Sequence, residues 1–287
     1  MKEKNKVEEG TLYLVATPIG NLADLSERAR KVLSEVDFVA AEDTRNTRAL
    51  LSHFDIHREL VSYHEHNKHE SGARITARLI AGESCALVTD AGMPAVSDPG
   101  EDLVRLAAEA GIPVTCVPGG TAAVTALALS ALPTARFIFE GFLPTEKRER
   151  ARRIEALAGE ERTAILYEAP HRLRKTLKEL SSLLGGDRPL SVARELTKLN
   201  EEVLRTTLAG AEAHFENTEP RGEFVLVLGG SVPKQETAAW EALTPREHVD
   251  AYIESGMERM DAIKAAARDR GISKSILYKI LQNGEDA

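Results

Sequence analysis

Three turns rich in glycine and proline carry the residues of this sequence that are best suited to binding a ligand. They are Thr17–Asn21, Thr89–Gly100 and Pro118–Ala122, and each follows an apolar run that is typical of a strand. Ligands of open α/β sheets bind beyond the carboxyl ends of the strands. Glycine lets a backbone approach a ligand closely, and proline stiffens the turn. Each turn alone could be a plain strand-to-helix connection, but three at equivalent strand ends favour a shared ligand site.

Other common site motifs are absent or incomplete. The sequence has no G-x-G-x-x-G after its first strand, no phosphate-binding G-x-x-x-x-G-K-[ST] and no G-x-S-x-G. These absences disfavour a dinucleotide site, a P-loop and an α/β-hydrolase. His64, His66 and His69 lie beside two glutamates, but their spacing matches no zinc template and no cysteine is near. We therefore expect no metal.

The first half of the chain must position these turns. Near-continuous apolar runs predict strands that are covered on both faces, and the amphipathic stretches between them predict helices. This alternation indicates an α/β layer with a mostly parallel sheet. Asp24 is a candidate N-cap, and Gly82 and Gly111 are candidate C-caps. The expected strands are 11–16, 36–41, 84–89 and 112–117, and the expected helices are 25–33, 44–51, 70–81 and 102–110.

The second half changes character. Its expected strands are 136–142, 163–168, 190–194, 203–208 and 223–229, and the last three are joined by short charged connections. This pattern predicts a mixed sheet with hairpin-like joins. A linker is expected around Ser231–Ala238. The predicted organisation is therefore an α/β domain over 11–120, a second α/β domain over 121–232 and a helical extension over 245–287.

The C-terminal segment is typical of a helix-turn-helix. Residues 259–270 predict one helix, Gly271 a turn, and Ser273 the cap of a second helix. The stretch 259–279 has six basic residues against two acidic ones, and Arg268, Arg270, Lys274 and Lys279 are expected to face outward. A nucleic-acid-binding arm is the favoured interpretation, and a small packing or dimerisation element is the alternative.

Composition limits the class of protein. The 287 residues are 43% apolar and 29% charged, which excludes a chain that is disordered throughout. The net charge of −8 argues against a non-specific polyanion binder, although local basic clusters remain available. No apolar run is long enough for a membrane span, and we expect no secretory signal. Cys85 and Cys116 lie singly in apolar runs, so we expect two buried thiols in a reducing cytoplasm.

An ordered set of motifs resembles a known family. They are Leu14–Ser26 (LVATPIGNLADLS), Ala41–Thr47 (AEDTRNT), Tyr63–Asn67 (YHEHN), Val88–Pro94 (VTDAGMP) with Ser97–Gly100 (SDPG), Glu140–Pro144 (EGFLP), Tyr167–Leu173 (YEAPHRL) and Ala193–Lys198 (ARELTK). Across about residues 11–230 the chain resembles the tetrapyrrole-methylase-like superfamily of S-adenosylmethionine (SAM) enzymes, and in particular its branch that modifies ribosomal RNA. Its first turn lacks the glycine-rich form of the corrin and siroheme branches.

The resemblance implies a two-domain α/β methylase with a C-terminal helix-turn-helix extension, which binds SAM between its domains and forms a homodimer. It further implies 2′-O-methylation of a cytidine in the decoding region of 16S rRNA. By position, the implied SAM-binding residues are Pro18, Asp90, Met93, Thr121, Ala122, Tyr167 and Leu196. Two alternatives remain open, namely a methylase of a tetrapyrrole-like small molecule and a non-catalytic ribosome assembly factor.

Methyl transfer to a ribose hydroxyl also requires loss of a proton, which a carboxylate or lysine can accept. The candidates are Asp43, Glu195 and Lys198. The alternative role of Asp43 is to cap the N-terminus of the next helix, and the alternative for Glu195 and Lys198 is that they form a surface ion pair. Arg45 and Arg172 suit phosphates, because a guanidinium matches them bidentately. The remaining candidate contacts to RNA are His64, His66, Asn67, Lys274 and Lys279, and ordering of their loop is the alternative for the first three.

Overall fold

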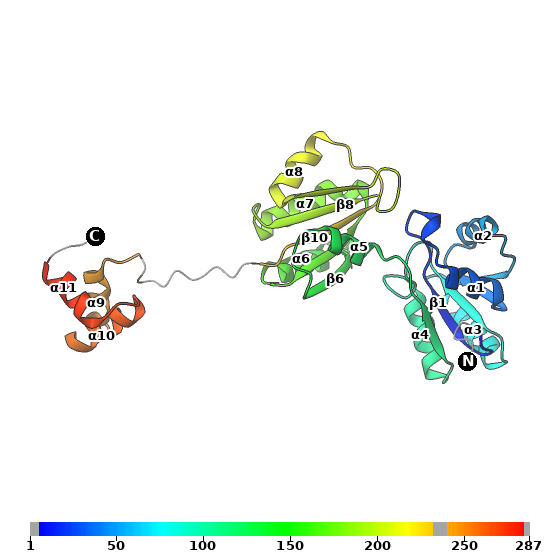
Figure 1. The fold of residues 1–287 in the computed structure, drawn as a ribbon, viewed down its shortest axis with the longest axis horizontal. Coiled ribbons are helices and arrows are strands. Elements are labelled where there is room, and N and C mark those ends of the chain that lie inside the picture. Colours follow the sequence, from blue (N-terminus) through cyan, green and yellow to red (C-terminus); the bar gives the residue numbers. More distant parts are fainter. Residues whose placement is uncertain (1–5, 232–239, 241, 284–287) are drawn as a thin grey trace. The chain divides into compact units, whose positions relative to one another are not determined.

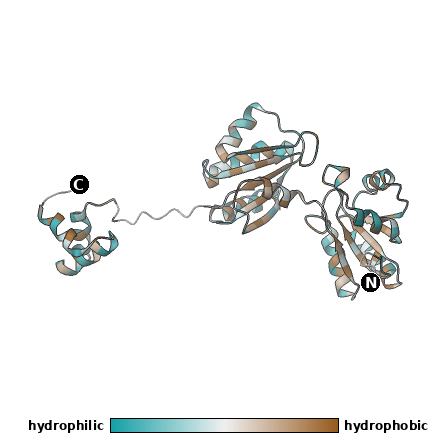
Figure 2. Ribbon diagram, viewed as in Figure 1, coloured by the Kyte–Doolittle hydropathy of each residue, from teal (hydrophilic) through white to brown (hydrophobic). Residues whose placement is uncertain are grey.

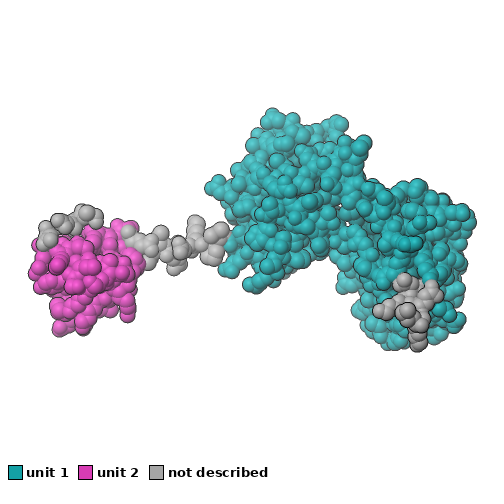
Figure 3. Space-filling view, viewed as in Figure 1, with its two compact units in different colours: residues 1–231 teal, residues 232–287 magenta. Residues whose placement is uncertain are grey.

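The computed structural model describes residues 6–231, 240 and 242–283, and the chain divides into two compact units (Figures 1 and 3). Unit 1 is residues 1–231 and unit 2 is residues 232–287. Unit 1 contains two five-stranded sheets. None of the helices that the structure describes is long and apolar enough to cross a membrane.

The first sheet is entirely parallel and has the strand order β3-β2-β4-β1-β5. Helices cover both of its faces, as the apolar strands predict. One face packs against α1 and α2, and the other packs against α3 and α4. The elements are β1 (Leu12–Val15), η1 (Leu22–Asp24), α1 (Glu27–Glu35), β2 (Phe38–Ala41), α2 (Thr44–His53), β3 (Glu59–Ser62), α3 (Lys68–Ile80), β4 (Cys85–Val88), α4 (Gly100–Glu109) and β5 (Val114–Val117).

The second sheet is mixed, in the order β6-β7-β10-β8-β9, with only β6 and β7 parallel. One face is covered by α6, α7 and α8, and the other by α5. Figure 2 shows the apolar colouring concentrated in the strands of both sheets. The elements are α5 (Ala122–Leu129), β6 (Phe137–Phe142), α6 (Lys147–Ala158), β7 (Thr163–Glu168), α7 (Pro170–Leu184), β8 (Pro189–Arg194), β9 (Glu202–Thr207), α8 (Leu208–Asn217) and β10 (Phe224–Leu228).

Unit 2 is a small three-helix bundle of α9 (Pro245–Glu254), α10 (Arg259–Asp269) and α11 (Lys274–Asn283). Its core is a cluster of small and aliphatic side chains that includes Val249, Ile263 and Leu277. A capping box begins α9, in which Thr244 and Glu247 exchange hydrogen bonds. Gly271 takes φ +65° at the turn between α10 and α11, as expected for a residue that ends a helix.

The fold class agrees with the sequence prediction, and the differences are local. The expected helix cap at Asp24 is wrong, because Ser26 caps α1 and Asp24 lies in a 3-10 turn. Strand β3 and the helices of the second half, α5, α6, α7 and α8, were not predicted, and α8 replaces the hairpin expected between β9 and β10. Cys85 is buried as expected, but Cys116 is exposed because β5 is an edge strand. The expected linker lies almost wholly outside the described residues.

Candidate functional site

The three glycine–proline turns meet at one place. The first and second turns are joined by a pair of backbone hydrogen bonds between Thr17 and Gly92, with N···O distances of 2.9 and 3.1 Å. A Cβ added to Gly92 would lie 3.3 Å from the side chain of Ile19, and one added to Gly120 would lie 3.6 Å from it. Ile19 of the first turn therefore touches both of the other turns, and glycine makes this approach possible.

The second half of unit 1 reaches the same place. Ile19, Ala122 and Tyr167 all pack against an apolar cluster on the α5 face of the second sheet, and Leu196 is a buried member of that cluster. Burial raises the pKa of the Tyr167 hydroxyl. A Cβ on Gly141 of β6 would lie 3.1 Å from the Ser97 hydroxyl of the second turn. Ser97 and Ala95 both have left-handed backbones. Non-glycine residues rarely adopt this conformation, which tends to occur at functional sites.

The loop after β8 completes the convergence. Glu195 and Thr197 have positive φ values of 50° and 65°. A Cβ on Gly20 would lie 2.5 Å from Cγ of Lys198, so the lysine stem passes directly beside the first turn. The buried hydroxyl of Thr197 has no hydrogen-bond partner among the described residues. A buried polar atom without a partner is uncommon and points to a group that a ligand can satisfy.

An ion-pair network holds this loop. Lys198 Nζ lies 2.9 Å from Glu195 and 3.0 Å from Glu223. The hydrogen bond from Lys198 lowers the pKa of Glu195. Burial lowers the pKa of Lys198, but its hydrogen bonds to both carboxylates outweigh this effect and raise it overall. At neutral pH the lysine is therefore a cation and Glu195 is an anion, and neither is poised to accept a proton.

A hollow of about 420 Å³ opens on the other side of the first turn. The first turn, α2 and the end of β4 supply its walls. Asp90 lines the hollow, and the Asn46 amide of α2 donates a hydrogen bond of 3.1 Å to its carboxylate. A larger hollow of about 670 Å³ lies beside Glu160 and Arg162, and no predicted site residue lines it. The hollow beside Asp90 is therefore the one connected with the predicted chemistry.

The seven predicted cofactor residues lie at or beside this convergence. Pro18 and Asp90 line the hollow, Leu196 belongs to the apolar cluster, and Ala122 and Tyr167 pack against that cluster. Met93 follows Gly92 and its sulfur lies 3.9 Å from that of Cys116. Thr121 follows Gly120 and occupies the N-cap position of α5 without a side-chain cap hydrogen bond. The structure thus brings together residues that are up to 178 positions apart.

Asp43 and Arg45 are engaged with each other. Asp43 is the N-cap of α2 and accepts a hydrogen bond of 2.8 Å from the Arg45 backbone amide. The side-chain hydrogen bond from Arg45 lowers the pKa of Asp43 to about 2. A carboxylate of such low pKa is a weak base, which favours the capping role over the catalytic one. The Arg45 side chain is 87% exposed.

The histidine-containing loop precedes α3. The Asn67 side chain organises this loop, because its oxygen accepts from the His64 backbone amide at 2.8 Å and its nitrogen donates to the Ser62 carbonyl at 3.1 Å. The rings of His64 and His66 pack edge to face at 5.9 Å. No group of three or more metal-ligating side chains occurs within the described part of the chain.

Arg172 belongs to an internal polar network. Its guanidinium donates a hydrogen bond of 2.7 Å to the Leu143 carbonyl and lies 3.5 Å from the buried carboxylate of Glu168. Glu168 also accepts hydrogen bonds from Thr176 and from the Ala169 amide. These contacts connect the ends of β6 and β7, so Arg172 has a structural task that the sequence did not reveal.

In unit 2, Lys279 is exposed and Lys274 is partly exposed, both on α11. The expectation that Arg270 faces outward is wrong. Arg270 donates to the Leu243 carbonyl and to Nδ1 of His248, and it lies over the ring of Trp240. Arg270 therefore helps to anchor the residues before α9 onto α10.

Sequence reasoning missed Asn46 and His53, which line the hollow from α2. Helical periodicity was the available signal, because residues 46, 49, 50 and 53 fall on one face of a helix. It also missed Glu223, which pairs with Lys198. Glu223 is 25 residues away from Lys198 in sequence, and only the pairing of β8 with β10 brings the two together.

Comparison with known proteins gives consistent results. The family model described as "Tetrapyrrole (Corrin/Porphyrin) Methylases" matches residues 11–212. A protein of Halalkalibacterium halodurans named "Ribosomal RNA small subunit methyltransferase I" is 50% identical over 95% of both chains, and a Bacillus subtilis protein of the same name is 45% identical over 97% of this chain and 96% of its own. The crystal structure of uroporphyrin-III C-methyltransferase from Thermus thermophilus, complexed with S-adenosylhomocysteine, matches with a TM-score of 0.52 and 23% identity, covering 76% of this chain and 97% of that one.

Proposed function

The chain belongs to the tetrapyrrole methylase family and, within it, to the group of small-subunit ribosomal RNA methyltransferases I, and from this premise we propose that it methylates RNA of the small ribosomal subunit with SAM as the donor. The main support for the proposal is sequence similarity: the chain is 50% identical, over 95% of both chains, to a relative of that name. The finer assignment, to the 2′-oxygen of a cytidine in the decoding region of 16S rRNA, follows the motifs that resemble the ribosomal RNA branch.

The residues at the convergence fit a SAM molecule. Gly92 and Gly120 let Ile19 pack closely between the turns, and the Asp90 carboxylate can accept hydrogen bonds from ribose hydroxyls or an amino group. Tyr167 and Leu196 offer apolar walls, and the unpaired Thr197 hydroxyl lies close to Gly20 of the first turn. The site thus combines polar groups that orient a ligand with apolar groups that bury it.

The chemistry that SAM supplies when bound is a methyl group on a positively charged sulfur, which a nucleophile can attack directly. The task of the protein is to hold the acceptor oxygen in line with that methyl group, and orientation of this kind accounts for much of an enzyme's rate. Three turns tied together at Ile19 form a rigid support for such alignment. In this proposal Pro18, Asp90, Met93, Thr121, Ala122, Tyr167 and Leu196 bind the donor.

The proton of the acceptor hydroxyl must also leave. The capping role and low pKa of Asp43 disfavour it as the acceptor. Glu195 and Lys198 are not poised to accept the proton either, but they can assist in another way, because the Lys198 stem passes beside Gly20 of the first turn. The lysine cation is suited to stabilising the developing negative charge on the acceptor oxygen, and Glu195 to holding the lysine in place. We therefore retain Glu195 and Lys198 as the residues that assist catalysis.

Several basic residues suit the RNA. Lys274 and Lys279, on unit 2, have side chains available to phosphates. Arg45, near the hollow, is 87% exposed, although its guanidinium also donates to Asp43. His64 and His66 suit contact with nucleotides, while the contacts of Asn67 favour its role in holding their loop. Arg172 is a weaker candidate, because the Leu143 carbonyl and Glu168 already occupy its guanidinium.

The predicted domains are 11–120, 121–232 and 245–287, and the last of them lies in unit 2. We assign unit 2 the role of an RNA-binding arm. Deleting the residues after Pro233 is expected to weaken the affinity for small subunits and leave that for SAM unchanged, as measured by filter binding and calorimetry. Equal affinity of the full and truncated chains for small subunits would reject the arm.

We further propose a cytoplasmic homodimer. The cytoplasmic location is supported by the proposed substrate, because ribosomes are assembled there, and the dimer is supported by exposed apolar side chains such as Val124, Phe142 and Leu199. Sedimentation tests the dimer.

The direct test uses labelled SAM and purified small subunits from cells that lack this enzyme. The wild-type chain is expected to transfer label to 16S rRNA, and mass spectrometry of RNA fragments is expected to place the methyl group on a cytidine ribose. Transfer of label to a tetrapyrrole-like compound instead of RNA, or an absence of SAM binding, would reject the proposed function.

A further inference from the structure

The first turn has different neighbours on its two sides. Ile19 packs against the apolar cluster that contains Leu196, as do Ala122 and Tyr167. Pro18, Gly20 and Leu22 instead line the hollow of about 420 Å³ in front of α2. Five of the seven residues proposed to bind the donor do not line this hollow, and only Pro18 and Asp90 belong to it. The hollow thus adjoins the donor residues at Pro18 and Asp90 and is otherwise a second space.

The second space has the character of a ligand pocket. Its volume lies within the range of about 300–1,000 Å³ that small-molecule pockets span. Pro18, Leu22, Ala49 and Leu50 give it apolar walls, and Asn46 and His53 add an amide and an imidazole. Asn46 makes one hydrogen bond within the described structure, from its nitrogen to Asp90, so its carbonyl oxygen can accept another. Amides and imidazoles are groups that can hydrogen-bond a base edge.

Charge around the hollow suits a nucleic acid. Arg45 directly precedes Asn46 on α2; its side chain is 87% exposed, and its Nε and Nη2 donate to Asp43. Arg48, also exposed on α2, lines a different hollow. RNA-binding proteins commonly place arginine on phosphates while an unstacked base enters a pocket of apolar and hydrogen-bonding groups. The polar groups within the hollow and the arginines outside it match this division.

We propose that the hollow between the first turn and α2 receives the nucleoside that is methylated, with Asn46 and His53 contacting its base. This inference rests on the proposed function and adds to it the place of the acceptor. The ribose then lies next to Pro18, Gly20 and Asp90, at the boundary with the donor residues, and the Lys198 stem passes beside Gly20. The 2′-oxygen attacks the methyl carbon, the carbon–sulfur bond breaks, and the hydroxyl proton leaves to solvent.

A pocket-filling variant provides the main test. Ala49 is an exposed residue of α2 that lines the hollow, so Ala49→Phe fills the space without disturbing the core. Ser52→Phe is the matched control, because Ser52 is exposed on the same helix but lines a different hollow. With small subunits as substrate, we expect Ala49→Phe to lower kcat by about tenfold or more. KM is expected to stay within about threefold, because most of the affinity comes from phosphate contacts.

A second pair of variants tests the polar contact. His53 lines the hollow, whereas His57 is exposed four residues later and does not. We expect His53→Ala to lower kcat several-fold and His57→Ala to leave it unchanged. Both the phenylalanine pair and the histidine pair are expected to bind S-adenosylhomocysteine with wild-type affinity by calorimetry, and circular dichroism is expected to show unchanged folding.

Two results would overturn the inference. If Ala49→Phe methylates small subunits at the same rate as Ser52→Phe, no nucleoside enters the hollow. Loss of S-adenosylhomocysteine binding in Ala49→Phe would assign the hollow to the donor. Failure of the proposed function is distinguishable from both, because the wild-type chain would then transfer no methyl group to 16S rRNA.

Discussion

The two ends of the first sheet are built in contrasting ways. At the carboxyl ends of the strands, three turns and the loop after β8 converge, with left-handed backbones at Ala95, Ser97 and Thr197. A hollow opens there, and the Thr197 hydroxyl is buried without a partner among the described residues. This end therefore contains strained backbone and polar groups that remain available to ligands.

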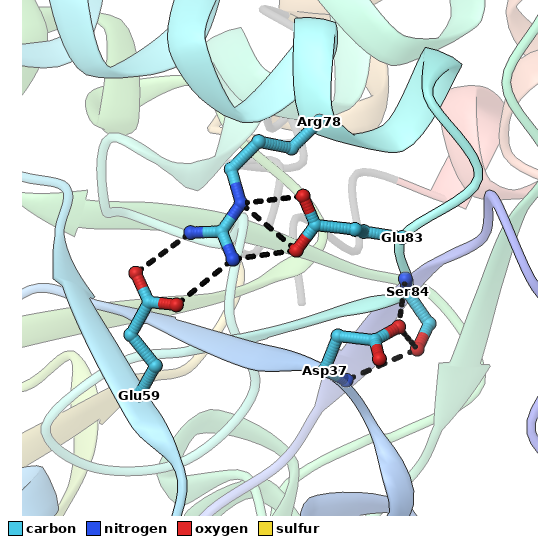
Figure 4. Close-up of polar contacts among 5 residues, drawn as sticks. All are labelled: Asp37, Glu59, Arg78, Glu83 and Ser84. Carbon is cyan, nitrogen blue, oxygen red and sulfur yellow. Dashed lines mark hydrogen bonds and ion pairs between the residues drawn. The ribbon is translucent and has the colours of Figure 1, made fainter.

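At the amino ends of the strands, polar groups satisfy one another (Figure 4). Arg78 of α3 is bonded by two hydrogen bonds to Glu59 and by three to Glu83, and its guanidinium lies 3.7 Å from the ring centre of Phe38. Asp37 and Ser84 exchange hydrogen bonds between the starts of β2 and β4. These contacts tie neighbouring strands together and leave little for a ligand.

The contrast shows that, in this parallel sheet, the ligand-binding connections and the stabilising ion pairs lie at opposite ends of the strands. Every strand runs in one direction, so all connections that face a ligand gather at one end, and the other end is free to be optimised for packing and ion pairing. Substitutions at the two ends are therefore expected to have opposite consequences: loss of ligand binding at the carboxyl ends and loss of stability at the amino ends.

The largest effect is expected for Asp90→Ala at the carboxyl end. Because this carboxylate is the polar group proposed to hold SAM, its loss should abolish SAM binding in calorimetry and reduce methylation by about 100-fold or more. The thermal unfolding midpoint should barely change, since Asp90 is exposed. Wild-type SAM affinity in this variant would reject the assigned role.

Gly222→Ala is expected to damage the loop that carries Glu195 and Lys198. Gly222 has φ +86°, and an added Cβ would lie 2.5 Å from the carboxyl group of Glu195. We expect loss of about 1–3 kcal/mol of stability and a roughly tenfold lower kcat, because Glu195 must move away from Lys198.

The control for this variant is Gly82→Ala at the amino end. Gly82 has a similar φ of +97°, but an added Cβ meets nothing within 4 Å. It should lose stability through backbone strain alone and keep its kcat. A reduced kcat in Gly82→Ala, measured on the same small subunits, would contradict the separation of the two ends.

Arg78→Ala should have the opposite pattern to Asp90→Ala. Its partners Glu59 and Glu83 have side chains that are 57% and 39% exposed, so solvent screens these ion pairs. We expect a loss of about 1–2 kcal/mol in urea unfolding, including the packing on Phe38, with SAM affinity unchanged. A normal unfolding midpoint together with impaired SAM binding would overturn the stabilising role of this network.

The smallest effect concerns acid stability. Hydrogen bonds from the Ser84 backbone and hydroxyl lower the pKa of Asp37 below its usual 3.8. Its contribution to stability is therefore complete above about pH 4 and is lost as the pH falls below that value through the folded-state pKa. Compared with Asp37→Asn, the wild type should lose stability more steeply below pH 4 in urea melts. Parallel pH curves would contradict this.

The sequence predicted the two sheets, because apolar runs and glycine–proline turns are local signals. Strand β3 was not predicted because its four residues, ELVS, begin with a charge and lie at the sheet edge. The exposure of Cys116 and the inward position of Arg270 depend on which elements lie next to them, so no local pattern could reveal either. The same holds for the pairing of Lys198 with Glu223, whereas the Asn46 face of α2 was accessible from helical spacing.

The most direct test of the central claim is a crystal structure of the protein with S-adenosylhomocysteine. We expect the ligand to contact all three glycine–proline turns, with Asp90 bonded to it and the space in front of α2 still open. A ligand bound outside that convergence, or one that fills the space between Pro18 and Ala49, would contradict it.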